Sequence, residues 1–394
     1  SFAGNKTAQG NTDGNGQGNF YYSPPSGYLA LCSSNLPDTT ISPNQSEQAD
    51  DHFNTITYTG DDATSRSLTG VGFKPDWIWY KHRSISYGHV MYDSSRGTGE
   101  NHLRVDNTIA EGDYNDLYGT LTSFDADGIT IARGDASGTE SAFFNTNGAT
   151  VVGWNWKANG GTTSSNTDGD ITSTVQANTT AGFSILTYTG NGSGGATIGH
   201  GLSSAPKWVI VKRRDASDDW SNFHTSLGGT KYIDLNSLNA VGTSSVVWND
   251  TDPTSSVVTL GTSNRVNGNS ATYVAYVFAE IEGYSKFGSY TGNGSTDGTY
   301  IHLGFRASWI MIKRTNGTGQ WFIMDNKRIG YNGANYRLLA DASSVEYTGT
   351  SSNVVDFLSN GFKCRTTSSN TNGSSDTYIY MAFAEQPFKL SNAR

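Results

Sequence analysis

Three lysines share one spacing, because each lies four residues after a tryptophan: Lys81, Lys212 and Lys313. Sixteen residues after the same tryptophan comes an acid or an imidazole: Asp93, His224 and Asp325. If the two segments form a hairpin, amine and carboxylate can lie on one face as a catalytic pair. A solvent-exposed ion pair at the rim of a sheet is the interpretation we favour, because the histidine breaks the pairing in the second copy.

Aromatic side chains are a second source of chemistry, since flat rings stack on the apolar faces of sugars. Trp77, Trp208 and Trp309 recur at the start of apolar segments, so we expect them in the core. Aromatic residues that have no counterpart in the other copies, or that lie in loops, are better candidates for binding. The candidate ligand-binding residues are Trp79, Tyr80, Tyr87, Tyr114, Tyr118 and Tyr331.

Two acidic stretches offer oxygen atoms to a calcium ion, "DADG" at 125–128 and "NTDGD" at 166–170. Neither has the ordered series of six or more oxygens that calcium loops supply, and Asp-Gly is also a common hairpin turn. We therefore expect no cofactor, with Ca²⁺ as the alternative. Its candidate ligands are Asp125, Asp127, Asp168 and Asp170.

Other catalytic and metal-binding classes lack a signal. The chain has no G-x-S-x-G motif and no H-x-x-x-H pattern, and nothing selects one pair of carboxylates for glycoside hydrolysis. Cys32 and Cys364 are the only cysteines, so a structural zinc site is not expected, and their pairing is left open. These observations favour a protein that is not an enzyme.

Composition limits the partners. The formal net charge of −9 argues against nucleic acid, which needs clustered basic residues. No apolar run approaches the roughly 18 residues of a membrane helix, so we expect no membrane insertion. Charged residues make up only 15%, so Asn, Ser, Thr and Gly must supply the polar surface. Aromatic and β-branched segments separated by such turns are typical of an all-β protein.

The chain repeats itself at an interval of about 100 residues. "WVIVKRR" at 208–214 matches "WIMIKRT" at 309–315, and "YTGNGS" occurs at 188–193 and 290–295. A diverged third copy contains "YTGDDA" at 58–63. The predicted division begins with an N-terminal piece and connector at 1–51 and a first repeat at 52–158. A Gly/Ser/Thr-rich linker at 159–182 follows, and then a second repeat at 183–286 and a third repeat at 287–394.

We therefore predict an all-β fold of three tandem antiparallel β-sandwich domains, jelly-roll or concanavalin-like. A period this long fits globular units that each bury their own core and follow one another along the chain. Each central strand is apolar on both faces, as in a sandwich. The repeated "YTGNGS" is predicted to be a structural turn whose Gly and Asn tolerate positive φ, with a ligand-binding tip as the alternative.

The segment "NFYYSPPSGYLALCSSNLP" at 19–37 resembles the closing strand of SPRY-like β-sandwich domains in phage tail proteins. The repeats, with "YTGNGS" and "FAEQPF", resemble an uncharacterised repeated domain of phage tail or receptor-binding proteins. The resemblance implies a place on the virion and attachment to a surface, and it carries over no catalytic residue. Only the end of the SPRY-like domain is present, so no site on it can be placed.

The leading expectation is a phage tail fibre or surface appendage on the outside of the virion, an extracellular location. It would bind a host-surface glycan or protein by multivalent contacts. Other virion proteins and copies of the same chain are expected partners, with a trimer by analogy to phage fibres. Two alternatives are a polysaccharide depolymerase and a capsid decoration or spacer protein without receptor binding.

Overall fold

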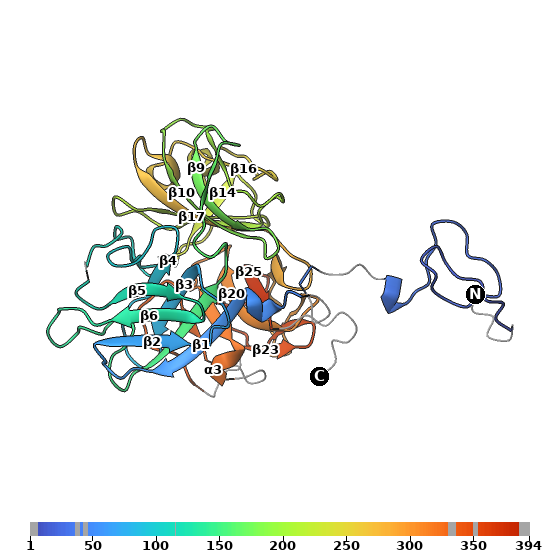
Figure 1. The fold of residues 1–394 in the computed structure, drawn as a ribbon, viewed down its shortest axis with the longest axis horizontal. Helices are drawn as coiled ribbons and strands as arrows, with labels where there is room; N and C mark the ends of the chain where they lie inside the picture. The colour runs from blue at the N-terminus through green and yellow to red at the C-terminus, as the bar shows by residue number, and fades with distance from the viewer. Residues whose placement is uncertain are drawn as a thin grey trace.

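The structure is a computed structural model of the chain and describes residues 7–35, 40–41, 46–114, 116–329, 336–349 and 354–385. Within these residues nearly all regular elements are antiparallel strands, so the predicted all-β fold class is confirmed. The helices are single turns: η1 (Ser33–Asn35), η2 (Ala49–Asp51), α1 (Ser245–Trp248), α2 (Asn264–Asn267) and α3 (Asn326–Ile329). In Figure 1 the N-terminal piece, residues 7–35, lies apart from the sheets.

Unit 1, which comprises β1 to β7, consists of two sheets (Figure 1). The larger has the order β1-β7-β3-β4, formed by Phe53–Thr59, Thr150–Trp156, Trp77–His82 and Val90–Asp93. The smaller has the order β2-β6-β5, formed by Ser65–Thr69, Gly128–Ala132 and Thr120–Asp125. Because side chains alternate along a strand, Ile78 and Tyr80 of β3 face the smaller sheet and pack in a cluster with Ile129.

Unit 2 comprises β8 to β17. Its larger sheet has the order β15-β14-β13-β12-β17-β10-β9-β8, formed by Gly242–Thr243, Lys231–Asp234, Ser221–His224, Trp208–Arg213, Thr272–Phe278, Phe183–Thr189, Ser173–Asn178 and Ser164–Asn166. Its smaller sheet pairs β11 with β16, which are Thr197–Gly199 and Val257–Thr259. A buried cluster that includes Leu186, Val209 and Val258 joins the two sheets.

Unit 3 comprises β18 to β25. Its larger sheet has the order β18-β25-β20-β21-β22, formed by Ser285–Thr291, Thr377–Ala384, Ala307–Arg314, Phe322–Asp325 and Leu338–Leu339. Its smaller sheet has the order β19-β24-β23, formed by Tyr300–His302, Gly361–Cys364 and Val355–Leu358. The three larger sheets share one arrangement of central strands. The last strand of each unit pairs on one side with β1, β10 or β18, and on the other side with the strand that begins at or near the repeated tryptophan.

The segment 159–182, predicted as a linker, instead extends the sheet of unit 2. Its strand β9 pairs with β10 along five residues, and β8 pairs with β9. Val175 is buried in the unit 2 cluster, and the buried Gln176 donates to Ser94 and Ser95 of unit 1 at 3.0 and 2.9 Å. The prediction failed because Ser and Thr suit exposed strand positions as well as loops.

Units 1 and 2 each bury a cluster between their own two sheets, but the expectation of separate cores fails for a further hydrophobic cluster, which contains residues of all three units. Trp77 of unit 1 stacks on Tyr276 of unit 2 with centroids 4.5 Å apart. Phe53 stacks on Phe383 of unit 3 at 5.2 Å, and the centroids of Trp208 and Trp321 lie 5.8 Å apart. The second apolar face of each larger sheet therefore packs against the neighbouring units. Apart from the segment 159–182, the predicted domain boundaries stay a prediction.

Candidate functional site

Three equivalent hydrogen bonds close the units into a ring. The residue 12 positions after the repeated tryptophan bonds to a backbone carbonyl of another unit in every copy. Trp220 Nε1 donates to Arg104 O at 2.9 Å, and Trp321 Nε1 donates to Asp234 O at 3.0 Å. In unit 1 this position is His89, whose Nε2 lies 2.8 Å from Leu339 O. We call the interface around each of these bonds a seam. Unit 2 contacts unit 1, unit 3 contacts unit 2, and unit 1 contacts unit 3, so there are three seams.

The tautomer of His89 follows from its two partners. Trp79 Nε1 donates to His89 Nδ1 at 2.7 Å, so Nδ1 is the acceptor and Nε2 carries the proton that it donates to Leu339 O. Burial, with Lys81 nearby, holds the pKa of His89 well below its usual value, so the ring is neutral. His89 thus replaces a tryptophan N–H at this seam.

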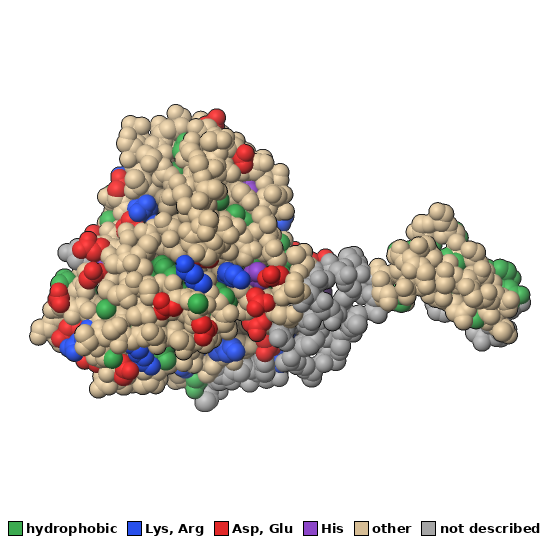
Figure 2. Space-filling view, in the orientation of Figure 1, with side chains coloured by type: hydrophobic (Ala, Val, Ile, Leu, Met, Phe, Trp, Pro, Cys, Tyr) green, Lys and Arg blue, Asp and Glu red, His purple; other side chains and the backbone are tan. Residues whose placement is uncertain are grey.

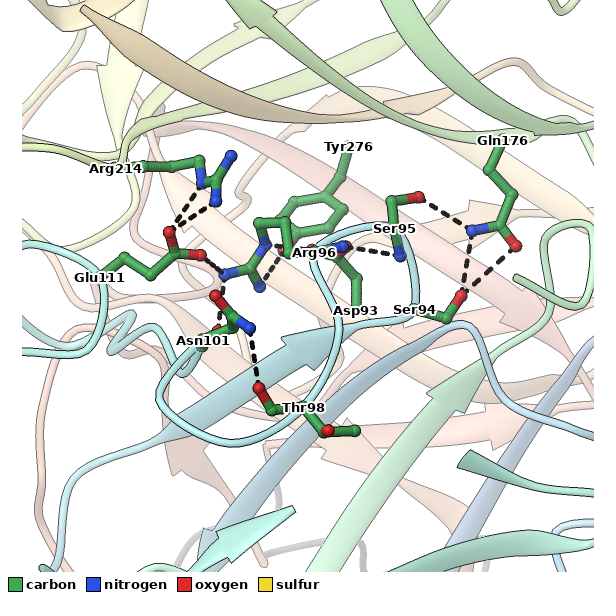
Figure 3. Close-up of polar contacts among 10 residues, drawn as sticks. All are labelled: Asp93, Ser94, Ser95, Arg96, Thr98, Asn101, Glu111, Gln176, Arg214 and Tyr276. Atoms are coloured by element: carbon green, nitrogen blue, oxygen red, sulfur yellow. Dashed lines mark hydrogen bonds and ion pairs between the residues drawn. The ribbon is translucent and has the colours of Figure 1, made fainter. Parts of the chain in front are cut away.

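A ladder of four buried or partly buried charges crosses the seam between units 1 and 2 (Figure 3). Arg96 Nε lies 2.5 Å from Asp93 Oδ2, another nitrogen of Arg96 bonds Glu111, and Arg214 lies 2.7 Å from the second oxygen of Glu111. Tyr276 of unit 2 donates to Asp93 at 2.8 Å. Two acids and two bases alternate, so the ladder is neutral as a whole.

The same ladder recurs at the seam between units 3 and 1. Arg328 lies 2.7 Å from both Asp325 and Glu346, and Arg83 lies 2.8 Å from Glu346. Trp154 Nε1 donates to Asp325 at 2.9 Å, where the other seam has Tyr276. At the seam between units 2 and 3 all four positions differ together, being His224, Leu227, Val241 and Thr315. The backbone bond beside the ladder persists at all three, as Glu111 N–Arg214 O, Glu346 N–Arg83 O and Val241 N–Thr315 O.

These contacts overturn the predicted rim ion pairs. Asp93 and Asp325 pair with arginines, and the lysines are fully buried. Lys212 Nζ donates across the seam to Thr108 O at 2.9 Å, and Lys313 Nζ donates to Ser237 O at 3.0 Å. Burial lowers the pKa of each of the three lysines to about 8. Lys212 and Lys313 therefore connect neighbouring units, whereas Lys81 Nζ donates to His82 O of its own unit at 2.6 Å.

A cleft in unit 1 gathers three of the predicted ligand-binding residues. Its volume is about 320 Å³. We call it the Tyr cleft, and its lining consists of Tyr87, Gly88, Arg104, Tyr114, Tyr118, Thr139, Ala142 and Phe143. The ring centroids of Tyr114 and Tyr118 lie 5.4 Å apart, and Phe143 lies 5.7 Å from Tyr118. None of the three phenol oxygens has a hydrogen-bond partner among the described residues.

Arg104 completes the Tyr cleft. Its guanidinium carbon lies 5.6 Å from the ring centroid of Tyr114 and 5.5 Å from that of Phe143. Behind the rings lies the buried His102, stacked on Tyr114 at 6.3 Å, and burial with Arg104 and Arg96 nearby lowers its pKa to about 4. The cleft therefore has aromatic walls, free hydroxyl groups and one cation, which suits a polar ligand with flat apolar faces.

The other predicted ligand-binding residues are placed differently. Trp79 and Tyr80 are in the core, at 1% and 0% exposure, so this prediction is wrong. Trp79 bonds His89, and the Tyr80 hydroxyl donates to Asn155 at 3.2 Å. Their lack of counterparts reflects different packing in unit 1. Tyr331 lies outside the described residues. Sequence reasoning missed Gly88, Arg104 and Phe143, because no motif marks them and only the fold brings them to the tyrosines.

The predicted calcium ligands are engaged in turns and hairpins. Asp125 accepts from Ser123 and Thr130, both at 2.6 Å, and Asp127 accepts from the backbone of Gly72 at 2.6 Å. Asp168 accepts from Asn166 at 2.9 Å, and Asp170 accepts from the Thr197 hydroxyl at 2.9 Å. Among the described residues no group of three or more His, Cys, Asp or Glu is placed to hold a metal. Calcium binding stays a prediction.

Cys32 and Cys364 are both free thiols, which answers the pairing that the sequence left open. Burial raises the pKa of the Cys364 thiol to about 12. In the part of the chain that the structure describes, none of the helices has the length and apolar composition needed to cross a membrane.

Comparison with known proteins gives one family. The family model described as "Domain of unknown function (DUF7483)" matches residues 48–387, a single span that covers all three units. The comparison with curated proteins gave no match, and neither did the comparison with solved structures.

Proposed function

Because the chain belongs to the DUF7483 family, whose description assigns no function, we propose one from its own residues: a non-enzymatic attachment protein of a virus particle that binds a host-surface glycan through the Tyr cleft. The observation that carries this proposal is the set of three tyrosine rings around a cleft of about 320 Å³. Pockets that hold one small ligand have volumes from about 300 Å³ upward.

The chemistry of the lining suits a sugar. Tyrosine rings offer apolar faces for the C–H groups of a pyranose, and the phenol oxygens are free to bond its hydroxyl groups. Among the described residues that line the Tyr cleft there is no Asp or Glu, so the alternative of a depolymerase would need its two carboxylates elsewhere. Binding without cleavage is therefore the function that this cleft supports best.

The virion setting rests on the resemblance to phage tail and receptor-binding proteins, with an extracellular position as a tail fibre or surface appendage. The surface is compatible with it. Figure 2 shows that the visible face of unit 2 carries few charges and that acids and bases are interspersed over the lower part of the molecule. A single Tyr cleft per chain would bind weakly, so other copies and other virion proteins would supply multivalency.

The test is binding of the full chain and its Tyr114→Ala variant to an immobilised glycan panel. We expect the chain to bind some glycans and the variant to bind them about tenfold or more weakly, because one stacked ring and one hydroxyl are lost. Tyr28→Ala, an exposed tyrosine of the N-terminal piece, is the matched control. Retained binding by Tyr114→Ala would remove the cleft from the proposal. Failure to bind any glycan or host cell in any oligomeric form would favour the spacer role, and release of sugar from the panel would favour the depolymerase.

A further inference from the structure

The guanidinium of Arg104 has no hydrogen bond with any described residue, although its side chain is only 12% exposed. Its Nε lies 3.6 Å from Asp106 Oδ1, which is an ion pair but too long for a hydrogen bond. A guanidinium carries five N–H donors in a planar fork. Leaving these donors unsatisfied in a partly desolvated place is unfavourable unless a ligand or water accepts from them.

The matching place in unit 2 holds an arginine, Arg265, whose two terminal nitrogens each pair with a carboxylate. The carbonyl groups of Arg104 and Asp234 occupy equivalent positions, because each accepts from the seam tryptophan. Arg265 bonds both oxygens of Asp234 at 2.8 Å and lies 2.7 Å from Asp219. Its guanidinium also lies 5.3 Å from the ring of Tyr232. In unit 2 the arginine beside a tyrosine thus has two carboxylate partners. In unit 1 Arg104 itself stands at the position of Asp234, and among the described residues no carboxylate hydrogen-bonds its guanidinium.

Asp106 does not supply the carboxylate that would hydrogen-bond the Arg104 guanidinium. Its Oδ1 accepts from the backbone N–H of His89 at 3.0 Å, as the side chains of Asn236 and Asp341 accept from Trp220 and Trp321 at the other seams. The Asp106 carboxylate is therefore part of the seam. It partly neutralises the charge of Arg104 without accepting hydrogen bonds from its guanidinium N–H groups. The fork stays available at the lining of the Tyr cleft.

Gly88 makes room for the guanidinium. A Cβ atom at residue 88 would lie 1.4 Å from Arg104 Nη2, so any side chain there would occupy the place of that nitrogen. The φ angle of Gly88 is not in the left-handed region, so the backbone itself would accept alanine. The glycine thus keeps open the space that the charge occupies.

From these contacts we propose that the Tyr cleft binds an acidic sugar, such as a uronic or sialic acid residue, whose carboxylate pairs with the Arg104 guanidinium. Arginine binds carboxylates through two parallel hydrogen bonds, and the pair gains strength where water is partly excluded. The sugar ring would stack on Tyr114 or Tyr118, whose hydroxyl groups are free. This inference rests on the proposed function and names the ligand class of the same cleft.

The experiment measures, by calorimetry on the full chain, the affinity for two oligosaccharides of equal length, one ending in glucuronic acid and one in glucose. We expect the acidic probe to bind about tenfold or more tightly, and to weaken as ionic strength rises. In Arg104→Lys, which keeps the charge and loses the fork, the preference should fall about tenfold. In Gly88→Ala, which displaces the guanidinium and keeps the arginine, it should fall similarly.

Controls separate this inference from its alternatives. Gly14→Ala, where an added Cβ meets nothing within 4 Å, and Arg213→Lys, an arginine paired with Asp215 away from the cleft, should keep the preference. Thermal midpoints of all variants show that they fold. Equal binding of both probes would overturn the inference and leave the proposed glycan binding intact, whereas failure of both to bind would count against both. An acidic preference that survives in Arg104→Lys and Gly88→Ala, or equal competition by inorganic sulfate or phosphate, would also overturn it.

Discussion

The four charged positions of the ladder are either all conserved or all replaced when the three seams are compared. Two seams contain Asp, Arg, Glu and Arg, and the third contains His, Leu, Val and Thr at the same four positions. A buried ion pair often contributes little compared with well-packed apolar residues, whereas removal of one partner leaves an unpaired charge. The four charged residues of a ladder should therefore be stable only when all four are present, and the third seam shows that uncharged residues can replace all four together.

We therefore expect one substitution in the ladder to destabilise the protein, and a combination of five substitutions to restore most of its stability. Arg96→Met should lower the free energy of unfolding by about 3–5 kcal/mol, because Asp93 and Glu111 lose their buried partner. In unit 3 the position of Tyr276 is occupied by Met381. The combined variant should recover most of that loss, because it copies the seam between units 2 and 3: Asp93→His, Arg96→Leu, Glu111→Val, Arg214→Thr and Tyr276→Met. Urea unfolding of the variants measures both effects. A combined variant less stable than Arg96→Met would contradict the equivalence of the seams.

Buried histidines predict a loss of stability in mild acid. Burial lowers the pKa of His82 and His224 to about 3 and that of His102 to about 4. The unfolded chain binds these protons near pH 6.5, whereas the folded chain does not, so protons are taken up on unfolding. Stability should therefore fall as pH drops from about 6.5 toward 4, by about 1.4 kcal/mol per pH unit for each histidine. Thermal midpoints that stay constant from pH 7 to 5 would contradict this.

At the scale of the element, the repeated "YTGNGS" is a fixed corner of units 2 and 3. Tyr188 stacks on Tyr273 with centroids 5.0 Å apart, and its hydroxyl donates to Val266 O at 2.6 Å. Tyr290 does the same with Tyr378 and Thr371 O. The turn that follows each tyrosine is bonded to the loop before the last strand of the unit, since Asn191 N donates to Asn267 Oδ1 at 2.9 Å and Asn293 N donates to Asn372 Oδ1 at 3.1 Å. The structural interpretation of this motif therefore agrees with its contacts.

Tyr188→Phe tests the corner without removing its ring. The carbonyl of Val266 loses its donor in a buried place, so the free energy of unfolding should fall by about 1–2 kcal/mol. The exposed Tyr28→Phe should leave it unchanged. Denaturant unfolding of both variants is the measurement, and equal stability of Tyr188→Phe and the unchanged chain would show that the hydroxyl does not hold the corner.

The sequence predicted the all-β fold class well, because aromatic and β-branched runs determine strand formation locally. It missed β8 and β9, since Ser and Thr at 164–178 do not distinguish an exposed edge from a loop. For the site it found Tyr87, Tyr114 and Tyr118, as loop aromatics, and it could not find Arg104. Whether an arginine lacks a partner depends on contacts between residues far apart in the chain, which no local pattern contains.

At the scale of the whole molecule, both faces of each larger sheet are buried, one within its unit and one against the other units. The fully buried Trp77, Trp208 and Trp309 belong to the cluster that all three units share. A unit taken alone would expose this aromatic face to water, at about 25 cal/mol for each Å². The ring and its core therefore form together, and Lys212 and Lys313 reinforce it by donating across two seams.

We therefore expect residues 48–385 to unfold in one cooperative transition, and damage to one seam to shift that transition as a whole. Trp321→Phe removes the donor to Asp234 O at the seam between units 2 and 3, and the buried carbonyl left behind should cost about 1–3 kcal/mol. Calorimetry should show a single peak at a lower midpoint. Two separated peaks, with unit 1 unaffected, would instead mean that the units fold independently and that their shared core contributes little.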